Sequence, residues 1–304
     1  MKYTCDRINS CAENPEKFVD ECAEKYRAAV TDCAEKIFAD TDKKIVMLAG
    51  PSSSGKTTTA KILSGIIEKL GGNAYSVSLD DFYRSHNEPD YPKNEKGEDD
   101  YECVESLAVD LIREKIASLV SGKETLLPEF DFSTGMRNDD VKSIDLGEND
   151  IIIIEGLHAL NPLITQGIDE KNLFKIYVSV STRIYEDNGD VLLSKRDLRF
   201  IRRAVRDYFT RSMSIKRTFD IWQSVSDGED KYLFPFEDYA DVKIDSFHPC
   251  EPCLIKDVAI GLLSEEDFEE YSEKAEQLRE KLKKFRSIDA SLLPEDSVLK
   301  EFIP

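Results

Sequence analysis

The sequence predicts an α/β fold with a mostly parallel central sheet, and three observations carry that prediction. Short, wholly apolar runs bounded by turn residues are typical of strands buried on both faces. Helical stretches alternate with these runs, which is the order expected of strands joined by right-handed crossovers. A glycine-rich turn directly follows the first run. The runs are residues 45–49, 74–79, 151–154 and 174–180.

Within this fold, a helix is expected from about residue 57 to residue 70, where Gly71-Gly72 ends it. Residues 84–100 are polar and acidic, which indicates a surface loop. A second helix is expected over residues 104–120. A further helical region over about 190–230 is rich in arginine and is expected to form a lid.

Three segments are expected along the chain. Residues 1–40 form an N-terminal helical extension, residues 41–263 the α/β domain, and residues 264–304 a helical tail packed on that domain. The apolar face expected of the first segment is formed by Phe18, Cys22, Tyr26, Ala29, Cys33 and Ile37. The apolar face expected of the tail is formed by Phe268, Tyr271, Ala275, Leu278, Leu282 and Phe285. The tail's face either packs on the domain or contacts a second subunit of a homo-oligomer.

Composition limits what such a protein does. The 304 residues include 41 Lys and Arg against 61 Asp and Glu, a formal net charge of −20. A surplus of acid on this scale disfavours a nucleic acid as the main partner. No apolar run approaches the ~18 residues of a membrane span, and the first six residues lack the apolar core of a secretory signal. We therefore predict a cytoplasmic protein that acts on a small molecule, with neither a nucleic-acid nor a membrane partner.

The seven cysteines are an odd number in a long chain without a signal sequence, which favours reduced thiols. Cys250 and Cys253 have the spacing of zinc ligands, and His248 is a third candidate. A structural zinc site needs a fourth ligand, which the neighbouring sequence does not supply. Ordinary thiols are therefore expected here rather than a zinc site.

The glycine-rich turn carries the strongest chemical signal. Residues 50–57 read Gly-Pro-Ser-Ser-Ser-Gly-Lys-Thr, a complete G-x-x-x-x-G-K-T run between an apolar strand and a helix. Glycines let several backbone N–H groups converge on phosphate oxygens at the positive end of a helix. The lysine offers an ammonium to the outer phosphates, and the threonine hydroxyl ligates magnesium. The residues expected to bind ATP here are Gly50, Ser52, Ser53, Ser54, Gly55, Lys56, Thr57 and Thr58. The fold is then of the P-loop NTPase type, with three layers.

Two acids stand where predicted strands end. Asp80 follows the run at residues 74–79, and Glu155 follows the run at residues 151–154. Carboxylates at the C-terminal edge of a parallel sheet point into the crevice where ligands bind. Asp80 there can deprotonate an attacking hydroxyl, and Glu155 can hold magnesium. A helix N-cap or a solvated turn is the simpler alternative for Asp80, and a lone acid after a strand, as at Glu155, is a weak motif by itself. Two roles are open for His158, which follows Glu155 closely: contact with a substrate, or support of residues that make such a contact.

A basic stripe marks the predicted lid. Its arginines are Arg196, Arg199, Arg202, Arg203, Arg206 and Arg211. Spacings of three and four set several of them on one helix face, in a chain whose net charge is strongly negative. Guanidiniums in such a stripe can close over a triphosphate. The alternative is a solvated helix that pairs with local acids such as Asp197 and Asp207.

Together these residues resemble the uridine kinase and phosphoribulokinase family of P-loop kinases. The matching segments are residues 50–58, 79–83, 130–137, 153–157, 199–207 and 239–242. More narrowly, the chain is similar to a bacterial branch of nucleoside kinases usually labelled uridine kinase, as residues 234–237 and 294–304 indicate. The resemblance covers the chain from about residue 41 to its end.

The resemblance implies roles for single positions. Asp80 matches the family's general base, and Glu102 stands where the family has an aspartate that holds ribose hydroxyls. Arg206 and Arg211 match lid arginines on the phosphates of ATP. The implied catalytic residues are Asp80, Lys56 and Arg206. The implied substrate-binding residues are Asp80, Tyr83, Glu102, Phe130, Arg137 and Arg203. The magnesium ligands expected are Thr57, Glu155 and Asp80.

Two positions depart from the family's pattern. Uridine–cytidine kinases have a tyrosine where Phe130 stands and a histidine where Gly135 stands, and both recognise the pyrimidine. Loss of a hydroxyl and an imidazole removes polar contacts that discriminate among bases. The expected reaction is transfer of the γ-phosphoryl group of ATP to the 5′-hydroxyl of uridine or a related nucleoside. The alternatives are a family member that acts on another sugar, sugar phosphate or polyol, a regulatory GTPase, and a non-catalytic binding module. The sequence lacks the Asn/Thr-Lys-x-Asp element with which GTPases read guanine, and intact Lys56, Thr57 and Asp80 argue against the binding module.

Overall fold

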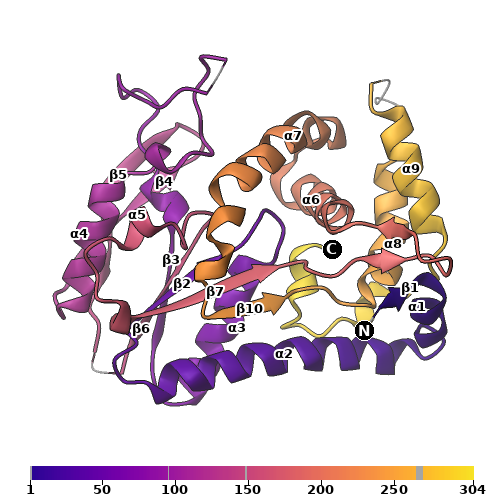
Figure 1. The fold of residues 1–304 in the computed structure, drawn as a ribbon, viewed down its shortest axis with the longest axis horizontal. Helices are drawn as coiled ribbons and strands as arrows, with labels where there is room; N and C mark the ends of the chain where they lie inside the picture. Colours follow the sequence, from indigo (N-terminus) through magenta and orange to yellow (C-terminus); the bar gives the residue numbers. More distant parts are fainter. Residues whose placement is uncertain (1, 95, 148, 265–269) are drawn as a thin grey trace.

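A five-stranded, wholly parallel sheet forms the centre of the computed structural model, which describes residues 2–94, 96–147, 149–264 and 270–304 (Figure 1). The strand order is β10-β7-β2-β6-β3, so β2 lies between two strands that come later in the chain. The strands are β2 (Ile45–Ala49), β3 (Ala74–Ser78), β6 (Ile151–Glu155), β7 (Leu173–Ser179) and β10 (Val242–Asp245). Crossovers diverge to either side of β2, and the crevice at such a point is where open α/β sheets bind ligands.

Helices cover both faces of this sheet, because alternate residues of each strand point into two separate cores. Val46 and Leu48 of β2 belong to the larger core, which includes α3. Met47 and Ala49 belong to the smaller core, which includes α4. The described helices are α1 (Cys5–Cys11), α2 (Pro15–Ala39), α3 (Lys56–Lys69), α4 (Val109–Val120), α5 (Pro162–Thr165), α6 (Lys195–Arg211), α7 (Ile215–Tyr232), α8 (Glu251–Leu262) and α9 (Ser272–Lys283). The three-layer arrangement that the sequence predicts is confirmed.

The other described strands form two smaller sheets. An antiparallel hairpin of β4 (Thr125–Asp131) and β5 (Met136–Ile144) lies between α4 and β6 along the chain. A three-stranded sheet pairs β1 (Tyr3–Thr4) with β8 (Ile184–Tyr185), and β8 with β9 (Val191–Leu193). The elements predicted from the sequence do not include the hairpin.

Three details differ from the sequence predictions. The helix expected from residue 104 begins at Val109, because Leu107 is extended (φ −91°, ψ 150°) after a short 3₁₀ helix. Ala29 of α2 is exposed, and Val30 is buried in its place, since a 3.6-residue repeat carries the inner face to that position. The tail helix is α9, which begins at Ser272, and Phe268 lies outside the described residues.

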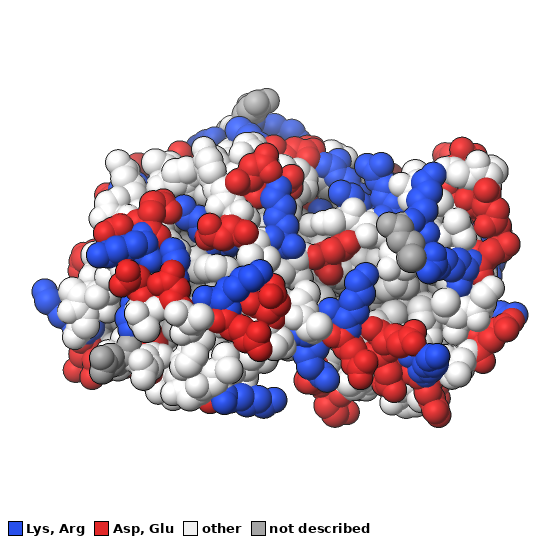
Figure 2. All heavy atoms as spheres, turned by 60° about the horizontal axis from the view of Figure 1, so that its bottom comes forward, with Lys and Arg blue, Asp and Glu red and all other residues white. Residues whose placement is uncertain are grey.

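The larger core joins segments that are far apart in the sequence. In Figure 1, α2 runs along one side of the molecule and packs on α3. Buried side chains of α2, α8, α9 and residues 298–303 all belong to this core. Acidic and basic side chains are interspersed on the side where α2 lies (Figure 2). None of the described helices combines the length and the apolarity that crossing a bilayer requires.

Candidate active site

The loop from β2 to α3, residues 50–55, has the conformation that a backbone anion site needs. Gly55 has a φ of 90° and Ser53 a φ of 58°, so the chain turns sharply before α3 begins. A side chain at Gly50 would collide with the carbonyl oxygen of Val178. The hydroxyls of Ser53 and Ser54 are buried and have no hydrogen-bond partner among the described residues. This P-loop (residues 50–57) therefore presents amides and unused hydroxyls at the positive end of α3.

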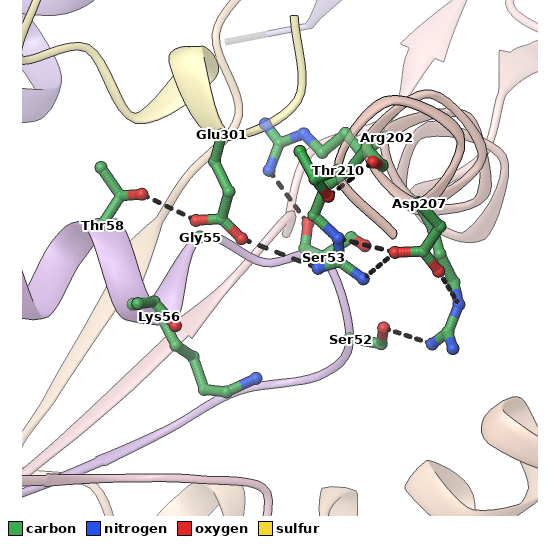
Figure 3. Close-up of polar contacts among 12 residues, drawn as sticks. Ser52, Ser53, Gly55, Lys56, Thr58, Arg202, Asp207, Thr210 and Glu301 are labelled. Atoms are coloured by element: carbon green, nitrogen blue, oxygen red, sulfur yellow. Dashed lines mark hydrogen bonds and ion pairs between the residues drawn. The ribbon is translucent and has the colours of Figure 1, made fainter. Parts of the chain in front are cut away.

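Lys56 and Thr57 begin α3 and point to different parts of the site. The Lys56 ammonium donates hydrogen bonds to the carbonyl oxygens of Gly50 (2.8 Å) and Pro51 (3.2 Å), so it folds back along the loop (Figure 3). The Thr57 hydroxyl donates to Oε1 of Glu155 at 3.0 Å. A hydroxyl and a carboxylate side by side offer the hard oxygen ligands that Mg²⁺ takes, together with water and phosphate oxygens.

Asp80 lies with these groups at the carboxyl edge of the sheet. It belongs to a 3₁₀ helix that follows β3 and is capped by the Ser78 side chain. Desolvation by the surrounding protein raises the pKa of Asp80, against the attraction of Lys56 and Arg211. Burial likewise raises the pKa of Glu155, with Lys56 opposing the shift and Asp80 adding to it. The structure thus brings together the P-loop lysine and both strand-end acids, one of which, Asp80, is the predicted base.

The next group of predicted residues surrounds Tyr83. Burial raises the pKa of the Tyr83 phenol, and the Asp80 and Glu102 carboxylates add to the shift. The Glu102 stem packs against Gly228 of α7, where an added Cβ would lie 2.8 Å from the Glu102 Cβ. Burial raises the pKa of Glu102 from 4.5 to about 7, although Arg203 opposes the shift. Glu102 therefore lies between helices α6 and α7 and the Asp80 carboxylate at the sheet edge.

Several aromatic rings pack together around Tyr83. Phe130 lies 5.6 Å from Tyr83, and the His86 ring lies 5.7 Å from Phe130 (centroid distances). We call these rings the aromatic cluster, which comprises Tyr83, His86, Tyr91, Tyr101, Phe130 and Phe132. Arg137, predicted to bind substrate, donates instead to Asp139 (2.8 Å) and to the carbonyl oxygen of Tyr83 (3.4 Å).

The three lid arginines predicted to meet substrate or phosphate gather around one buried carboxylate. Asp207 of α6 is fully buried and pairs with Arg203 (3.2 Å), Arg206 (2.7 Å) and Arg211 (3.6 Å). Arg203 also donates to the Ser52 hydroxyl at 2.6 Å, which ties the cluster to the P-loop. Positive charge therefore exceeds negative charge in this cluster, on the side of the P-loop that faces α6.

Two other arginines of the stripe are buried in ion pairs, so neither alternative offered by the sequence, a guanidinium that closes over a triphosphate or a solvated helix, describes them. Arg199 pairs with Glu229, and its Nε donates to the Ser52 carbonyl oxygen (2.9 Å). Arg202 pairs with Glu251 through both Nε and Nη2, at 2.5 and 2.7 Å. Each buried guanidinium needs a charged partner. Arg199 thereby connects α6 with α7 and the P-loop, and Arg202 connects α6 with α8. The sixth arginine of the stripe, Arg196, is exposed and pairs with an acid of α7.

Two histidines carry information that the sequence alone does not show. The His86 ring fills the space in front of Gly135, where an added Cβ would lie 2.9 Å from the His86 Cγ. The His158 ring is buried, and burial lowers its pKa to about 4, although contact with the Glu102 backbone opposes the shift. Sequence spacing does not reveal the environment of either histidine, because both environments arise from contacts between segments that are distant in the chain.

The candidate zinc ligands lie at the start of α8. Cys250 and Cys253 are free, buried thiols. The Nδ1 atom of His248 lies 3.0 Å from the Ser246 carbonyl oxygen, a hydrogen-bond partner within its own segment. Over the described parts of the chain, no group of three His, Cys, Asp or Glu side chains is arranged to hold a metal ion.

Comparison with known proteins places this site in a family. The model of the Phosphoribulokinase / Uridine kinase family matches residues 45–251, which is more than half of the chain. The chain belongs to this family. It is therefore an ATP-dependent kinase that transfers a phosphoryl group to a hydroxyl of a small substrate, as the sequence predicts.

Individual proteins are similar to this kinase over most of its length. A uridine kinase of Ureaplasma urealyticum is 29% identical over 204 residues, which cover 66% of this kinase and 86% of the relative. A uridine kinase of Staphylococcus aureus is 28% identical over 201 residues, with the same coverage. The solved structure of a possible uridine kinase from Bacillus stearothermophilus is 20% identical with a TM-score of 0.46, and the match covers 73% of this kinase and 100% of that chain.

Proposed function

We propose that this kinase phosphorylates the 5′-hydroxyl of uridine or a related nucleoside, with Mg²⁺ bound by Thr57 and Glu155. The observation that carries the proposal is the aromatic cluster, which begins at Tyr83 beside Asp80 and Glu102. Aromatic rings stack on a nucleobase, and such stacking contributes about 1–3 kcal/mol per base. Two cations close to the cluster, Arg84 and Arg137, are paired with acids, so the rings are the main surface offered there.

His86 adds a polar group to this apolar surface. Its ring lies within the aromatic cluster, 5.0 Å from Tyr101 and 5.7 Å from Phe130. Because the ring occupies the space in front of Gly135, an imidazole is present there although residue 135 carries no side chain. An imidazole offers a donor and an acceptor to the edge of a base. This arrangement supports a base-containing acceptor despite the departures at Phe130 and Gly135.

In the proposed reaction, each group of the site has a separate task, which begins with binding of the phosphates of ATP. The P-loop amides and Lys56 hold the phosphates, and bound Mg²⁺ would neutralise charge that develops on them. Glu102 accepts hydrogen bonds from the ribose hydroxyls, which fixes the 5′-hydroxyl near Asp80. Asp80, whose raised pKa suits it to take a proton, deprotonates that hydroxyl as it attacks the γ-phosphorus. The bond from this phosphorus to the β,γ-bridging oxygen breaks at the same step, and ADP leaves. Arg206 and Arg211 neutralise the transferred group.

A screen with radiolabelled ATP tests the acceptor. Uridine, cytidine and adenosine are compared with a hexose, a pentose phosphate and glycerate at equal concentration. We expect label to be transferred to a nucleoside, with a kcat/KM at least tenfold above that of any sugar or polyol. Transfer to a sugar, sugar phosphate or polyol alone would replace the nucleoside proposal and leave the kinase assignment intact.

The variant Asp80→Asn tests the base. The amide keeps the size of the side chain but cannot accept the proton, so we expect kcat to fall by about 10²–10⁴-fold. Binding of Mg·ATP, measured by calorimetry, should stay within about threefold of the wild-type value. Turnover equal to that of the wild type would exclude Asp80 as the base.

A further inference from the structure

The chain's C-terminal segment lies directly against the P-loop. Residues Val298–Glu301 form a 3₁₀ helix, and a Cβ at Gly55 would lie 2.5 Å from Cγ2 of Val298. The Thr58 hydroxyl donates a hydrogen bond to Oε2 of Glu301 at 2.8 Å. The other carboxylate oxygen lies 3.7 Å from the Arg206 guanidinium. Figure 3 shows the Glu301 carboxylate directed at Thr58 beside the loop.

This segment is fixed in place by its own packing. Val298, Leu299, Phe302 and Ile303 are at most 3% exposed and belong to the larger core. The Phe302 ring also lies 4.8 Å from the Arg202 guanidinium. Burial of four apolar side chains makes release of the whole segment costly. The Glu301 side chain, by contrast, is 18% exposed, so it can turn while the backbone stays docked.

The two partners of Glu301 are groups that a nucleotide also needs. Thr58 lies in the first turn of α3, where backbone N–H groups lack helical partners and can donate hydrogen bonds to an anion. Arg206 belongs to the arginine cluster around Asp207. A P-loop holds the inner phosphates at the start of its helix. The Glu301 carboxylate thus occupies two groups, the Thr58 hydroxyl and the Arg206 guanidinium, that could otherwise bind a phosphate.

We propose that Glu301 is a placeholder anion: its carboxylate holds Thr58 and Arg206 in the absence of nucleotide, and a phosphate of ATP displaces it from both. The inference rests on the proposed role of the P-loop in binding the phosphates. Glu301 then positions Thr58 and Arg206, weakens nucleotide binding by charge repulsion, and favours release of ADP when it returns. Its effect is on nucleotide affinity, because it touches no acceptor.

Calorimetric titration of the full chain with Mg·ATP and Mg·ADP tests this role. Glu301→Gln keeps the shape of the side chain and removes its charge, so we expect Kd for both nucleotides to fall about tenfold, equivalent to about 1.4 kcal/mol. Glu301→Asp keeps the charge but shortens its reach, and an intermediate Kd is expected. The matched control is Glu295→Gln, which removes the charge of an almost fully exposed acid shortly before this segment and should leave Kd unchanged.

Added salt gives a second readout that lost packing would not reproduce. The difference in Kd between Glu301→Gln and the wild type should shrink at high ionic strength, since salt screens the repulsion. A Kd at or above the wild-type value in both Glu301 variants overturns the inference. Lys56→Ala separates this outcome from failure of the P-loop proposal, because that variant should lose Mg·ATP binding. Full binding by Lys56→Ala would overturn the P-loop proposal itself.

Discussion

His86 places an imidazole in front of Gly135, a position that has no side chain of its own. Gly135 has a φ of 69°, a region that histidine adopts more readily than most residues. The backbone N–H of His86 donates to the Gly135 carbonyl oxygen at 2.9 Å, which holds the two segments together. An imidazole can therefore reach the same space from either position.

Exchange of the imidazole between these positions tests whether it reads the base. His86→Ala should raise the KM for the nucleoside about tenfold with a small change in kcat, because a hydrogen bond to the base is lost. Adding Gly135→His to that variant should restore most of the KM, since the second ring enters the space that the first has left. Steady-state kinetics with uridine measures both effects. A KM unchanged by His86→Ala would show that His86 does not read the acceptor.

Glu102 makes the stability of the protein depend on pH. Its pKa is about 7 in the folded protein, against 4.5 for the free side chain, so the folded state holds a proton that the unfolded state has lost between those values. Stability must therefore fall as pH rises through this window. Glu102→Gln should remove the fall and stabilise the protein by at most about 3 kcal/mol at pH 8. Urea unfolding at pH 5 and pH 8 compares the two proteins, and parallel pH profiles would contradict the assignment.

Residues whose role follows from the chain's local order could be predicted from the sequence. Lys56 and Thr57 lie within a contiguous motif, and Asp80 and Glu155 follow buried strands, so the parallel sheet brings all four to one edge. Glu301 could not be found in this way, because its contacts with Thr58 and Arg206 join segments that lie far apart in the chain. Sequence spacing carries no information about such contacts.

At the scale of elements, α6 is the helix whose sequence pattern is misleading. Its arginines recur at helical spacing, which is typical of a solvated face. The faces that carry Arg199 and Arg202 are nevertheless buried, because Glu229 of α7 and Glu251 of α8 meet them. The hairpin β4–β5 escapes prediction for a related reason, since β5 is mostly polar and exposed and shows no alternation of apolar residues.

The buried pair between α6 and α8 yields a test at this scale. Arg202→Met leaves the Glu251 carboxylate buried without its partner, so we expect a loss of about 3–5 kcal/mol in the free energy of unfolding. Adding Glu251→Gln should recover part of that loss, because the unpaired charge is gone. Urea unfolding with an unchanged m-value measures both variants. A loss below about 1 kcal/mol in the single variant would show that the pair contributes little.

The molecule as a whole is tied together by the larger core. Residues of α2, α3, α8, α9 and segment 298–303 share it, and they come from all three of the segments that the sequence predicts. A shared core couples the stabilities of the parts that build it. The net charge of −20 is spread over a surface on which both signs occur, at least on the side shown in Figure 2.

We therefore expect one cooperative unfolding transition for the whole chain. Calorimetric and van't Hoff enthalpies should agree, and Mg·ATP should raise Tm because it binds only the folded state. Lys56→Ala should unfold in one transition as well but gain no Tm from Mg·ATP. Two resolved transitions would show that the N-terminal helices or the tail unfold independently of the sheet.

The wall that residues 298–302 build beside the P-loop has a consequence for biosynthesis. Translation makes the P-loop before this wall, so a growing chain on the ribosome passes through lengths at which Val298 does not yet lie against Gly55. Val298 and Phe302 reach Gly55 only after they emerge from the exit tunnel. The P-loop therefore acquires this neighbour after its own synthesis and not together with it.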